Sequence, residues 1–427
     1  MKALRNRDFR YLWLAGLISD TGDWLLLASL PIAVYLYTGS TLGTAIAFIT
    51  ALVPPIVLAP LAGAIADRFD RRRVLMLVSI AQALALLPLL AVHNRSGLPV
   101  LYSVIVVQAA LAAVFDPTKN ALLPNLVDRS ELVSANSLIG LNQNIGRLIG
   151  APLGGLLLAA AGGLGTIVAV DAVSFLLAVI LIARLSAVRT PATPHAEAPS
   201  QRGGGWRDAL ASRTIRGGLA VLLLSSIAQG LFLVLYVVFV ARVLHGGPAE
   251  VGLLRGVQAI GSIGGGLLLA IVAKVRPGRL TAISAIVFGL LSVVIWNAPR
   301  LTTGPAVYVA LFILVGAPGI AMITGLISAV QEATDDRIRG RIFALFGVAA
   351  SLGQAIGMVA GGVLGDPVGV VPVLNVQGLL YIVCGVVAAA TLTGRRTADR
   401  AVPRQPAAAV SSETPTDAEP QTVRPSR

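Results

Sequence analysis

Two aspartates, Asp20 and Asp23, lie three residues apart within an apolar run that covers residues 11–37. On a helix this spacing places both carboxylates on one face, roughly 14–18 Å along the run at a rise of about 1.5 Å per residue. Carboxylates this close repel each other when both are charged, so one of them favours holding a proton. The pair is therefore a candidate proton-binding site. The alternatives are that one aspartate pairs with a cation such as Arg147 or caps a kink near Gly22.

Other charged residues also interrupt apolar runs. A charge at the centre of a bilayer costs about 2.5–3.5 kcal/mol on insertion scales, so each one needs a partner or a function. Arg147 is either part of an ion pair that locks helix packing or a counter-ion that releases a carboxylate when substrate or a proton arrives. Asp116 and Lys119 are spaced to pair with each other on one helix. Asp171 is a further candidate for proton binding.

Composition places these charges in a membrane. The chain has 427 residues, of which 56% are hydrophobic and only 12% charged, and its mean hydropathy is +0.83. Soluble domains average about 25% charged residues, so a soluble multidomain enzyme and a disordered chain are both excluded. A helix needs about 20 apolar residues to cross the hydrocarbon core. Twelve candidate spans meet that requirement: 11–37, 42–66, 74–93, 99–123, 132–160, 165–185, 217–243, 249–273, 280–298, 304–330, 342–365 and 370–393.

The basic residues predict an orientation. Of 33 lysines and arginines, 27 fall in segments on the side of the N-terminus, whereas the opposite loops carry only Arg95, Arg242 and Arg300. Because basic loops stay in the cytoplasm, both termini are expected there. The net charge of +13 therefore reflects topology and not a nucleic-acid partner. One cysteine and three scattered histidines predict neither a disulfide nor a metal site.

The sequence predicts two six-helix halves, at residues 1–185 and 217–393, joined by a cytoplasmic linker at 186–216 and followed by a disordered tail at 394–427. A G-x3-G-x3-G-G pattern recurs at an offset of 207 residues. Such a parallel duplication is the plan of many secondary transporters. Small residues at this spacing let helices approach closely, either as static packing or as a sliding contact between the halves. The glycines are Gly146, Gly150, Gly154, Gly155, Gly353, Gly357, Gly361 and Gly362.

A loop motif resembles a known family. Residues 63–72 resemble the G-x3-D-R-x2-R-R motif of the major facilitator superfamily, and residues 115–136 resemble its drug-efflux branch, which contains macrolide and siderophore exporters. Residues 146–155 are similar to the antiporter motif of that branch, although Pro152 stands one position later than usual. The span-four arginine common in proton antiporters is missing, and Lys119 is the nearest substitute.

The resemblance implies an all-α polytopic membrane protein with twelve transmembrane helices as two pseudo-repeats, the major facilitator fold. It also implies that Asp67 contacts a helix end of the other half and holds the cytoplasmic side shut. Arg72 and Arg73 are expected to serve topology alone. The expected conformational gate consists of Gly63, Asp67, Arg68, Asp70, Arg71 and Arg72.

Uncharged side chains inside the spans are also candidates for a cavity. Aromatic residues either contact a lipophilic substrate or pack in the core; they are Trp24, Tyr35, Phe232, Tyr236 and Phe239. The polar residues either bridge helices or face a cavity; they are Gln82, Gln108, Gln229, Gln258, Gln354, Asn375 and Gln377.

No phosphate-binding loop or nucleophile motif is present, so neither direct ATP use nor an enzyme is expected, and no cofactor or metal. We expect a monomeric secondary transporter in a bacterial inner (plasma) membrane. It would export small amphiphilic compounds of drug, macrolide or siderophore type by alternating access and proton antiport, with protons and the lipid bilayer as partners. The alternatives are an importer or facilitator of a metabolite or lipid, and a non-transporting membrane sensor or assembly protein.

Overall fold

The computed structural model describes residues 3–128, 130–161, 163–186, 212–271 and 275–393. These residues form twelve long helices, with no strand among them, and the connections that are fully described are short loops and 3-10 turns. The helices are α1 (Arg7–Thr38), α2 (Thr41–Arg68), α3 (Arg71–Ala85), α4 (Leu98–Leu122), α5 (Leu132–Ala161), α6 (Gly165–Ala183), α8 (Arg213–Arg242), α9 (Pro248–Ile271), α10 (Pro277–Asn297), α11 (Pro305–Glu332), α12 (Asp336–Leu364) and α13 (Val370–Leu392).

The helix ends follow from capping residues. The Asn6 side chain accepts hydrogen bonds from the first turn of α1, and Ser40 caps α2 in the same way. Gly39 ends α1 with φ +64°, a left-handed conformation that glycine adopts without steric cost. The chain can therefore reverse direction between α1 and α2 within two residues.

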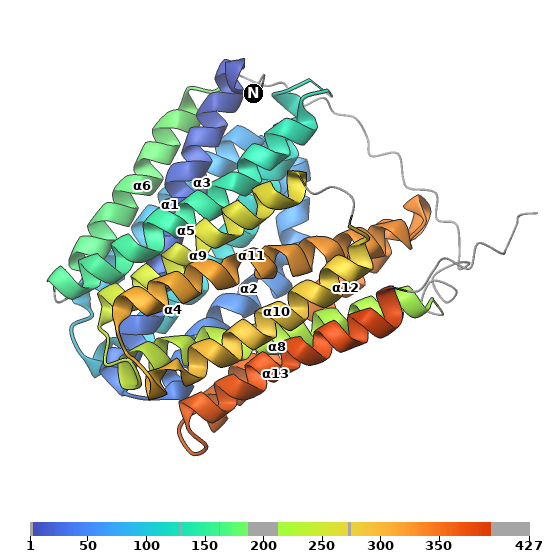
Figure 1. Cartoon of the computed structure of the whole chain (residues 1–427). Coiled ribbons are helices and arrows are strands. Elements are labelled where there is room, and N and C mark those ends of the chain that lie inside the picture. Colours follow the sequence, from blue (N-terminus) through green and yellow to red (C-terminus); the bar gives the residue numbers. More distant parts are fainter. Residues whose placement is uncertain (1–2, 129, 162, 187–211, 272–274, 394–427) are drawn as a thin grey trace, which may run out of the picture. The chain divides into compact units, whose positions relative to one another are not determined.

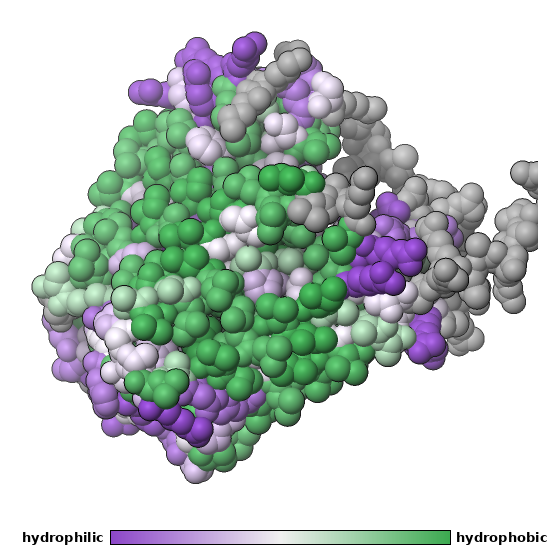
Figure 2. Space-filling model, viewed as in Figure 1, coloured by the Kyte–Doolittle hydropathy of each residue, from purple (hydrophilic) through white to green (hydrophobic). Residues whose placement is uncertain are grey.

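The predicted all-α membrane fold is confirmed. Eleven of the helical segments are long and apolar enough to cross a membrane, and α5, the remaining long helix, carries Asn142, Asn144 and Arg147 along its length. The helices run back and forth between two ends of the bundle (Figure 1). Figure 2 shows the broad hydrophobic surface that lies between the hydrophilic residues at these ends.

The two ends of the bundle differ in charge. We call the end that carries Arg68 and Arg71–Arg73, between α2 and α3, the arginine-rich face, and the end that carries Gly39 and Ser40 the opposite face. α1 begins at the arginine-rich face, and its midpoint lies next to Asp23. The aspartates singled out in the sequence therefore lie deep within the bundle.

Helix packing repeats between α1–α6 and α8–α13. α5 packs on α1 in the first six helices, and α12 packs on α8 in the second six. Extensive contacts between the two sets join α5 to α9 and α2 to α12. The division into two halves remains a prediction, and residues 187–211 of the expected linker and all of the expected tail lie outside the described residues. α8 begins at Arg213, four residues before the predicted span.

Candidate functional site

Three carboxylates surround the middle of α1. Asp20 and Asp23 lie on α1 itself, and Asp171 of α6 packs so closely on Gly22 that a Cβ there would overlap its Oδ1 atom. Asp171 and Asp20 act electrostatically on Asp23. The Ser174 hydroxyl donates to Asp171 Oδ1 at 3.0 Å. The three predicted proton-binding candidates are therefore neighbours, and their role in proton binding remains a prediction.

Two of these carboxylates are incompletely paired. Asp20 and Asp171 are almost fully buried, and the Oδ2 atom of each has no hydrogen-bond partner among the described residues. A buried carboxylate oxygen without a donor is costly when the group is charged, and protonation removes that cost. The arrangement can therefore hold and release a proton.

Lys119 joins this group from α4. Its Nζ atom lies 3.2 Å from Asp116 Oδ1, which confirms the predicted pair, and 3.6 Å from Asp20 Oδ1, which the sequence did not predict. Asp116 is 58% exposed, whereas Lys119 and Asp20 are buried. Lys119 thus links a buried carboxylate to an accessible one.

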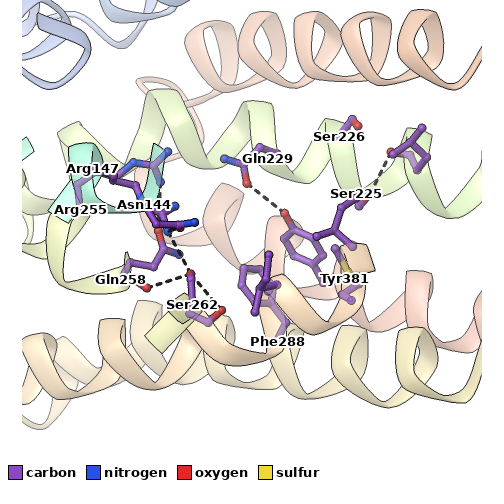
Figure 3. A pocket seen from close by; sticks show the side chains of 16 residues that line it. Asn144, Arg147, Ser225, Ser226, Gln229, Arg255, Gln258, Ser262, Phe288 and Tyr381 are labelled. Atoms are coloured by element: carbon purple, nitrogen blue, oxygen red, sulfur yellow. Dashed lines mark hydrogen bonds between the residues drawn. The ribbon is translucent and has the colours of Figure 1, made fainter. Parts of the chain in front are cut away.

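A cavity of about 330 Å³ lies between the first and second six helices. Figure 3 shows Arg147 and Arg255 side by side near Asn144, whereas Ser225 and Tyr381 lie farther along the cavity. Other lining residues come from α8, α9, α10 and α11, and they include Gln229, Gln258, Ser262 and Phe288. Gln229 and Gln258 are the predicted polar residues that face this cavity.

Arg147 has no acidic partner among the described residues. Its Nη2 atom donates to Ser262 Oγ at 3.1 Å and to Asn144 Oδ1 at 3.3 Å, while its Nε atom is buried without an acceptor. The suggested pairing of Arg147 with Asp20 or with Asp23 is therefore wrong for this conformation, because the arginine lies on the α5–α9 side of α1.

Arg255 lies inside the predicted span 249–273, and no role was predicted for it. Its Nη1 atom donates to Gln258 Oε1 at 3.4 Å. Its guanidinium lies 5.8 Å from the centroid of the Trp24 ring, and that of Arg147 lies 5.7 Å from the same centroid. A lone arginine inside an apolar span was the only sign in the sequence that Arg255 could line a cavity. Helix packing shows in addition that Arg147 and Arg255 flank the indole ring of Trp24.

A second, mostly apolar cavity of about 310 Å³ lies within the first six helices. Its walls include Asp23, Trp24, Phe48, Ile105 and Asp116. A narrow space lined by both Trp24 and Arg255 lies beside it. Trp24 therefore connects an apolar cavity to the arginines of the central cavity.

The remaining aromatic candidates divide by their surroundings. Tyr236 and Phe239 are buried in an aromatic cluster with Trp296 and Phe312. Both therefore pack in the core, and Tyr236 also lines the narrow space beside Arg255. Phe232 lies under the Arg255 guanidinium at 5.0 Å, which places it beside the cavity.

The gate loop on the arginine-rich face is held by backbone contacts. Asp70 caps α3 by accepting the Arg73 N–H at 2.8 Å. Arg71 donates to the carbonyls of Ala66 and Ala121, which ties α2 to α4. Topology alone does not account for Arg72, because it donates to two carbonyls at the end of α6.

Asp67 is exposed, and its carboxylate has no hydrogen bond or ion pair within the described ranges. The predicted contact with a helix end of the other half is therefore not made in this conformation. Arg68 is also exposed, and a Cβ at Gly63 would meet open space. The gating role of these residues remains a prediction.

The repeated glycines face corresponding neighbours. Gly150 meets the Thr21 carbonyl of α1, and Gly357 meets the Ile227 carbonyl of α8. Gly146 and Gly154 also face α1, and Gly353 and Gly361 face α8. In each stripe the fourth glycine faces the other six helices instead: Gly155 contacts α9 and Gly362 contacts α2. The glycines therefore contribute both to packing within each set of six helices and to contact between the two sets.

A polar latch joins the first and second six helices at the opposite face. Arg242 Nη1 lies 2.7 Å from Asp366 Oδ1, and Arg242 Nε donates to the Tyr35 hydroxyl at 2.7 Å. The Thr41 N–H donates to Asp366 Oδ2, and its hydroxyl donates to the Gly362 carbonyl. Partial burial alone would raise the pKa of Asp366, but hydrogen bonds from Arg242 and Thr41 outweigh it and hold the pKa below its usual range. Sequence reasoning missed this latch.

Comparison with known proteins agrees with this architecture. A family model described as transmembrane secretion effector matches residues 1–421. This chain belongs to that family. As a transmembrane secretion effector it is a transporter of the major facilitator superfamily, as the resemblance implied, and it is not an enzyme.

Named relatives of this transmembrane secretion effector include exporters. The chain is 27% identical over 394 residues to the multidrug efflux pump Tap of Mycolicibacterium fortuitum, covering 88% of this chain and 93% of the relative. It is 27% identical over 402 residues to the enterobactin exporter EntS of Citrobacter koseri, covering 88% and 90%. A bacterial homologue of the iron transporter ferroportin has the same fold, with a TM-score of 0.70, 18% identity, and coverage of 91% and 99%.

Proposed function

We propose that this protein exports small amphiphilic compounds across a bacterial plasma membrane by proton-coupled alternating access. The observation that carries the proposal is a central cavity whose walls come from both sets of six helices, together with a second cavity in the first six helices whose wall includes Asp23. The relatives named as a multidrug efflux pump and an enterobactin exporter support export as the direction. Each chain contains its own cavity, which supports a monomeric transporter.

The arginine-rich face is proposed to lie in the cytoplasm, together with both termini. Basic loops at one end of a helical bundle are retained on the cytoplasmic side. Arg68, Arg71–Arg73 and Arg339 all lie at this end. The Arg242–Asp366 latch then closes the external side.

Contacts between the first and second six helices support alternating access. Gly155 meets Pro248 and Gly252 near the opposite face, and Gly362 meets Ala45 there. Small residues at these crossings let the helices approach closely, which supports a sliding contact between the two sets. Asp67 is exposed in this conformation, so closure of the arginine-rich face is proposed to bring its loop against the second six helices.

Proton coupling is assigned to Asp23, Asp20 and Asp171. Asp23 lies on a cavity wall, whereas Asp20 and Asp171 are buried behind it. A proton on this group removes the cost of its unpartnered oxygens. Lys119 stabilises Asp20 when Asp20 is charged.

The test uses inverted membrane vesicles that contain a pH-sensitive dye and an acidic interior. Lipophilic cations, macrolides, siderophore-like compounds and organic anions are added in turn. Substrate-dependent release of protons is expected in the wild type, and Asp23→Asn should abolish it. Asp67→Asn should slow it, because the variant weakens closure of the arginine-rich face. Asp128→Asn, which changes an exposed carboxylate, is the matched control and should behave as the wild type.

Downhill substrate exchange without proton movement, unchanged in Asp23→Asn, would contradict antiport and favour a facilitator. Uptake of substrate in the opposite direction would contradict export and favour an importer.

A further inference from the structure

Two buried cations of the central cavity lack a counter-charge. Arg147 and Arg255 have only uncharged hydrogen-bond partners among the described residues: Asn144 and Ser262 for the first, Gln258 for the second. The Nε atom of Arg147 has no acceptor at all. Both guanidinium groups line the same cavity (Figure 3).

Among the described residues, no acidic side chain makes an ion pair with either arginine. Asp23 lines the apolar cavity of the first six helices and not the central cavity. Asp171 packs on Gly22, on the α6 side of α1. Asp20 and Asp116 are paired with Lys119 of α4. Trp24, on the α5–α9 side of α1, is the residue that the two arginines flank. The positive and negative groups therefore lie on different sides of one helix.

An unpaired cation at this depth is expensive, at about 2.5–3.5 kcal/mol for each residue on insertion scales. Two like charges near one ring also repel each other. An anion placed between them offsets both costs. The planar guanidinium matches the geometry of carboxylate, sulfonate or phosphate groups, because it offers parallel N–H donors.

We infer that the central cavity binds the acidic group of an amphiphilic organic anion between Arg147 and Arg255, while the apolar part of the same molecule occupies the adjoining cavity beside Trp24. This inference rests on the proposed function and specifies its substrate class. Asn144 and Ser262 lie within hydrogen-bond reach of Arg147 and orient its guanidinium toward the cavity.

The position of the two arginines also links binding to helix movement. Arg147 belongs to α5 of the first six helices, and Arg255 belongs to α9 of the second six. An anion held by both joins α5 to α9 across the cavity. Its arrival therefore favours a conformation in which these helices remain together, and its release removes that link.

The test measures binding to the purified full-length protein in nanodiscs of phosphatidylcholine, by fluorescence anisotropy. The probes are 6-carboxyfluorescein, which is anionic, and rhodamine 6G, a cationic dye with a related ring system. We expect Arg147→Gln and Arg255→Gln each to weaken binding of 6-carboxyfluorescein at least tenfold, without weakening that of rhodamine 6G. Arg300→Gln, which removes an exposed arginine, should change neither.

Lysine variants test whether weaker binding in the glutamine variants comes from loss of the fold. Arg147→Lys and Arg255→Lys keep the charge but lose the paired donors, so their affinity for 6-carboxyfluorescein should fall between those of the wild type and the glutamine variants.

Nanodiscs that contain phosphatidylglycerol distinguish two sources of the anion, a lipid headgroup and a free organic anion. Displacement of the dye by this lipid would identify a lipid headgroup as the ligand, and retention of the dye would identify a free organic anion.

Equal affinity of the wild type and the Arg147→Gln/Arg255→Gln double variant for 6-carboxyfluorescein would overturn the inference. An equal loss of rhodamine 6G binding in the glutamine variants would also overturn it. Proton-coupled export of rhodamine 6G, together with 6-carboxyfluorescein binding that does not depend on the two arginines, would keep the proposed function while refuting the anion site. Arginine-dependent dye binding without export in vesicles would keep the anion site while refuting the exporter.

Discussion

At the scale of single residues, the charges within the membrane differ in how they are neutralised. Lys119 contacts both Asp20 and Asp116, whereas Arg147 and Arg255 have uncharged partners. A buried ion pair contributes little net stability, but removal of one partner leaves an uncompensated charge. The Lys119–Asp20 ion pair therefore affects the stability of the fold and is also a candidate for proton coupling.

Lys119→Gln should destabilise the protein by about 3–5 kcal/mol, because Asp20 then remains buried without its cation. The Asp20→Asn/Lys119→Gln double variant should recover most of this loss, since no buried charge remains. The measurement is the apparent unfolding temperature of detergent-solubilised protein, followed by size-exclusion chromatography. A double variant as unstable as Lys119→Gln would show that the ion pair does not determine stability here.

At the scale of helices, the glycine stripes determine how closely neighbouring elements approach. Gly150 lies against the Thr21 carbonyl of α1, and Gly357 lies against the Ile227 carbonyl of α8. Helix backbones meet at these points, so there is no room for a side chain. Other glycines of the same helices, such as Gly347 of α12, face open space.

Gly357→Ala should destabilise the protein by about 1–3 kcal/mol, because its Cβ forces α12 away from α8. Gly347→Ala, ten residues earlier on the same helix, should instead stabilise it by about 0.5–1 kcal/mol, through the lower conformational entropy of the unfolded chain. Apparent unfolding temperatures of the two variants provide the comparison. Two shifts of the same sign and size would contradict close backbone contact as the reason for Gly357.

At the scale of the whole molecule, the latch at the opposite face stabilises one conformation. Arg242 and Asp366 belong to the second six helices and hold Tyr35 and Thr41 of the first six. Asp67 at the arginine-rich face is exposed in the same structure. The two sets of helices are therefore joined at the latch, whereas Asp67 of the gate loop makes no hydrogen bond or ion pair with the second six helices among the described residues.

Asp366→Asn should open the opposite face in a larger fraction of molecules, because Arg242 loses its charged partner. The chain has one cysteine, Cys384, so a Cys384→Ala background allows spin labels at Arg95→Cys and Arg300→Cys, which are exposed near this face. Double electron–electron resonance should show a longer distance component in the variant. The same distribution in both proteins would show that the latch does not stabilise closure.

The latch should be insensitive to pH near neutrality. The hydrogen bonds that outweigh partial burial hold the pKa of Asp366 below its usual range, which is about 3.9 for an aspartate. A lowered pKa stabilises closure fully above the usual value, and this contribution is lost as the pH falls through the lowered one. The label distances should therefore stay constant from about pH 5 to about pH 8. A transition within that range would assign control of closure to another group.

Much of the fold could be predicted from the sequence, because the determinants of a membrane span are local. A span needs about 20 apolar residues in succession, and each predicted run overlaps one of the observed helices. The Asp116–Lys119 pair was equally predictable, since residues three apart on one helix must be neighbours. The glycine repeat indicated close packing for the same reason.

Only the tertiary structure decided which distant charges meet. Asp20 and Lys119 lie on different helices, Arg242 and Asp366 are 124 positions apart, and Arg147 and Arg255 come together around Trp24. Apolar periodicity does not specify how helices are rotated or which of them cross, because lipid and protein interior are nearly equally apolar surroundings for such surfaces. The sequence by itself therefore determined the spans and their charges, while helix packing decided which charges are paired and which line the cavity.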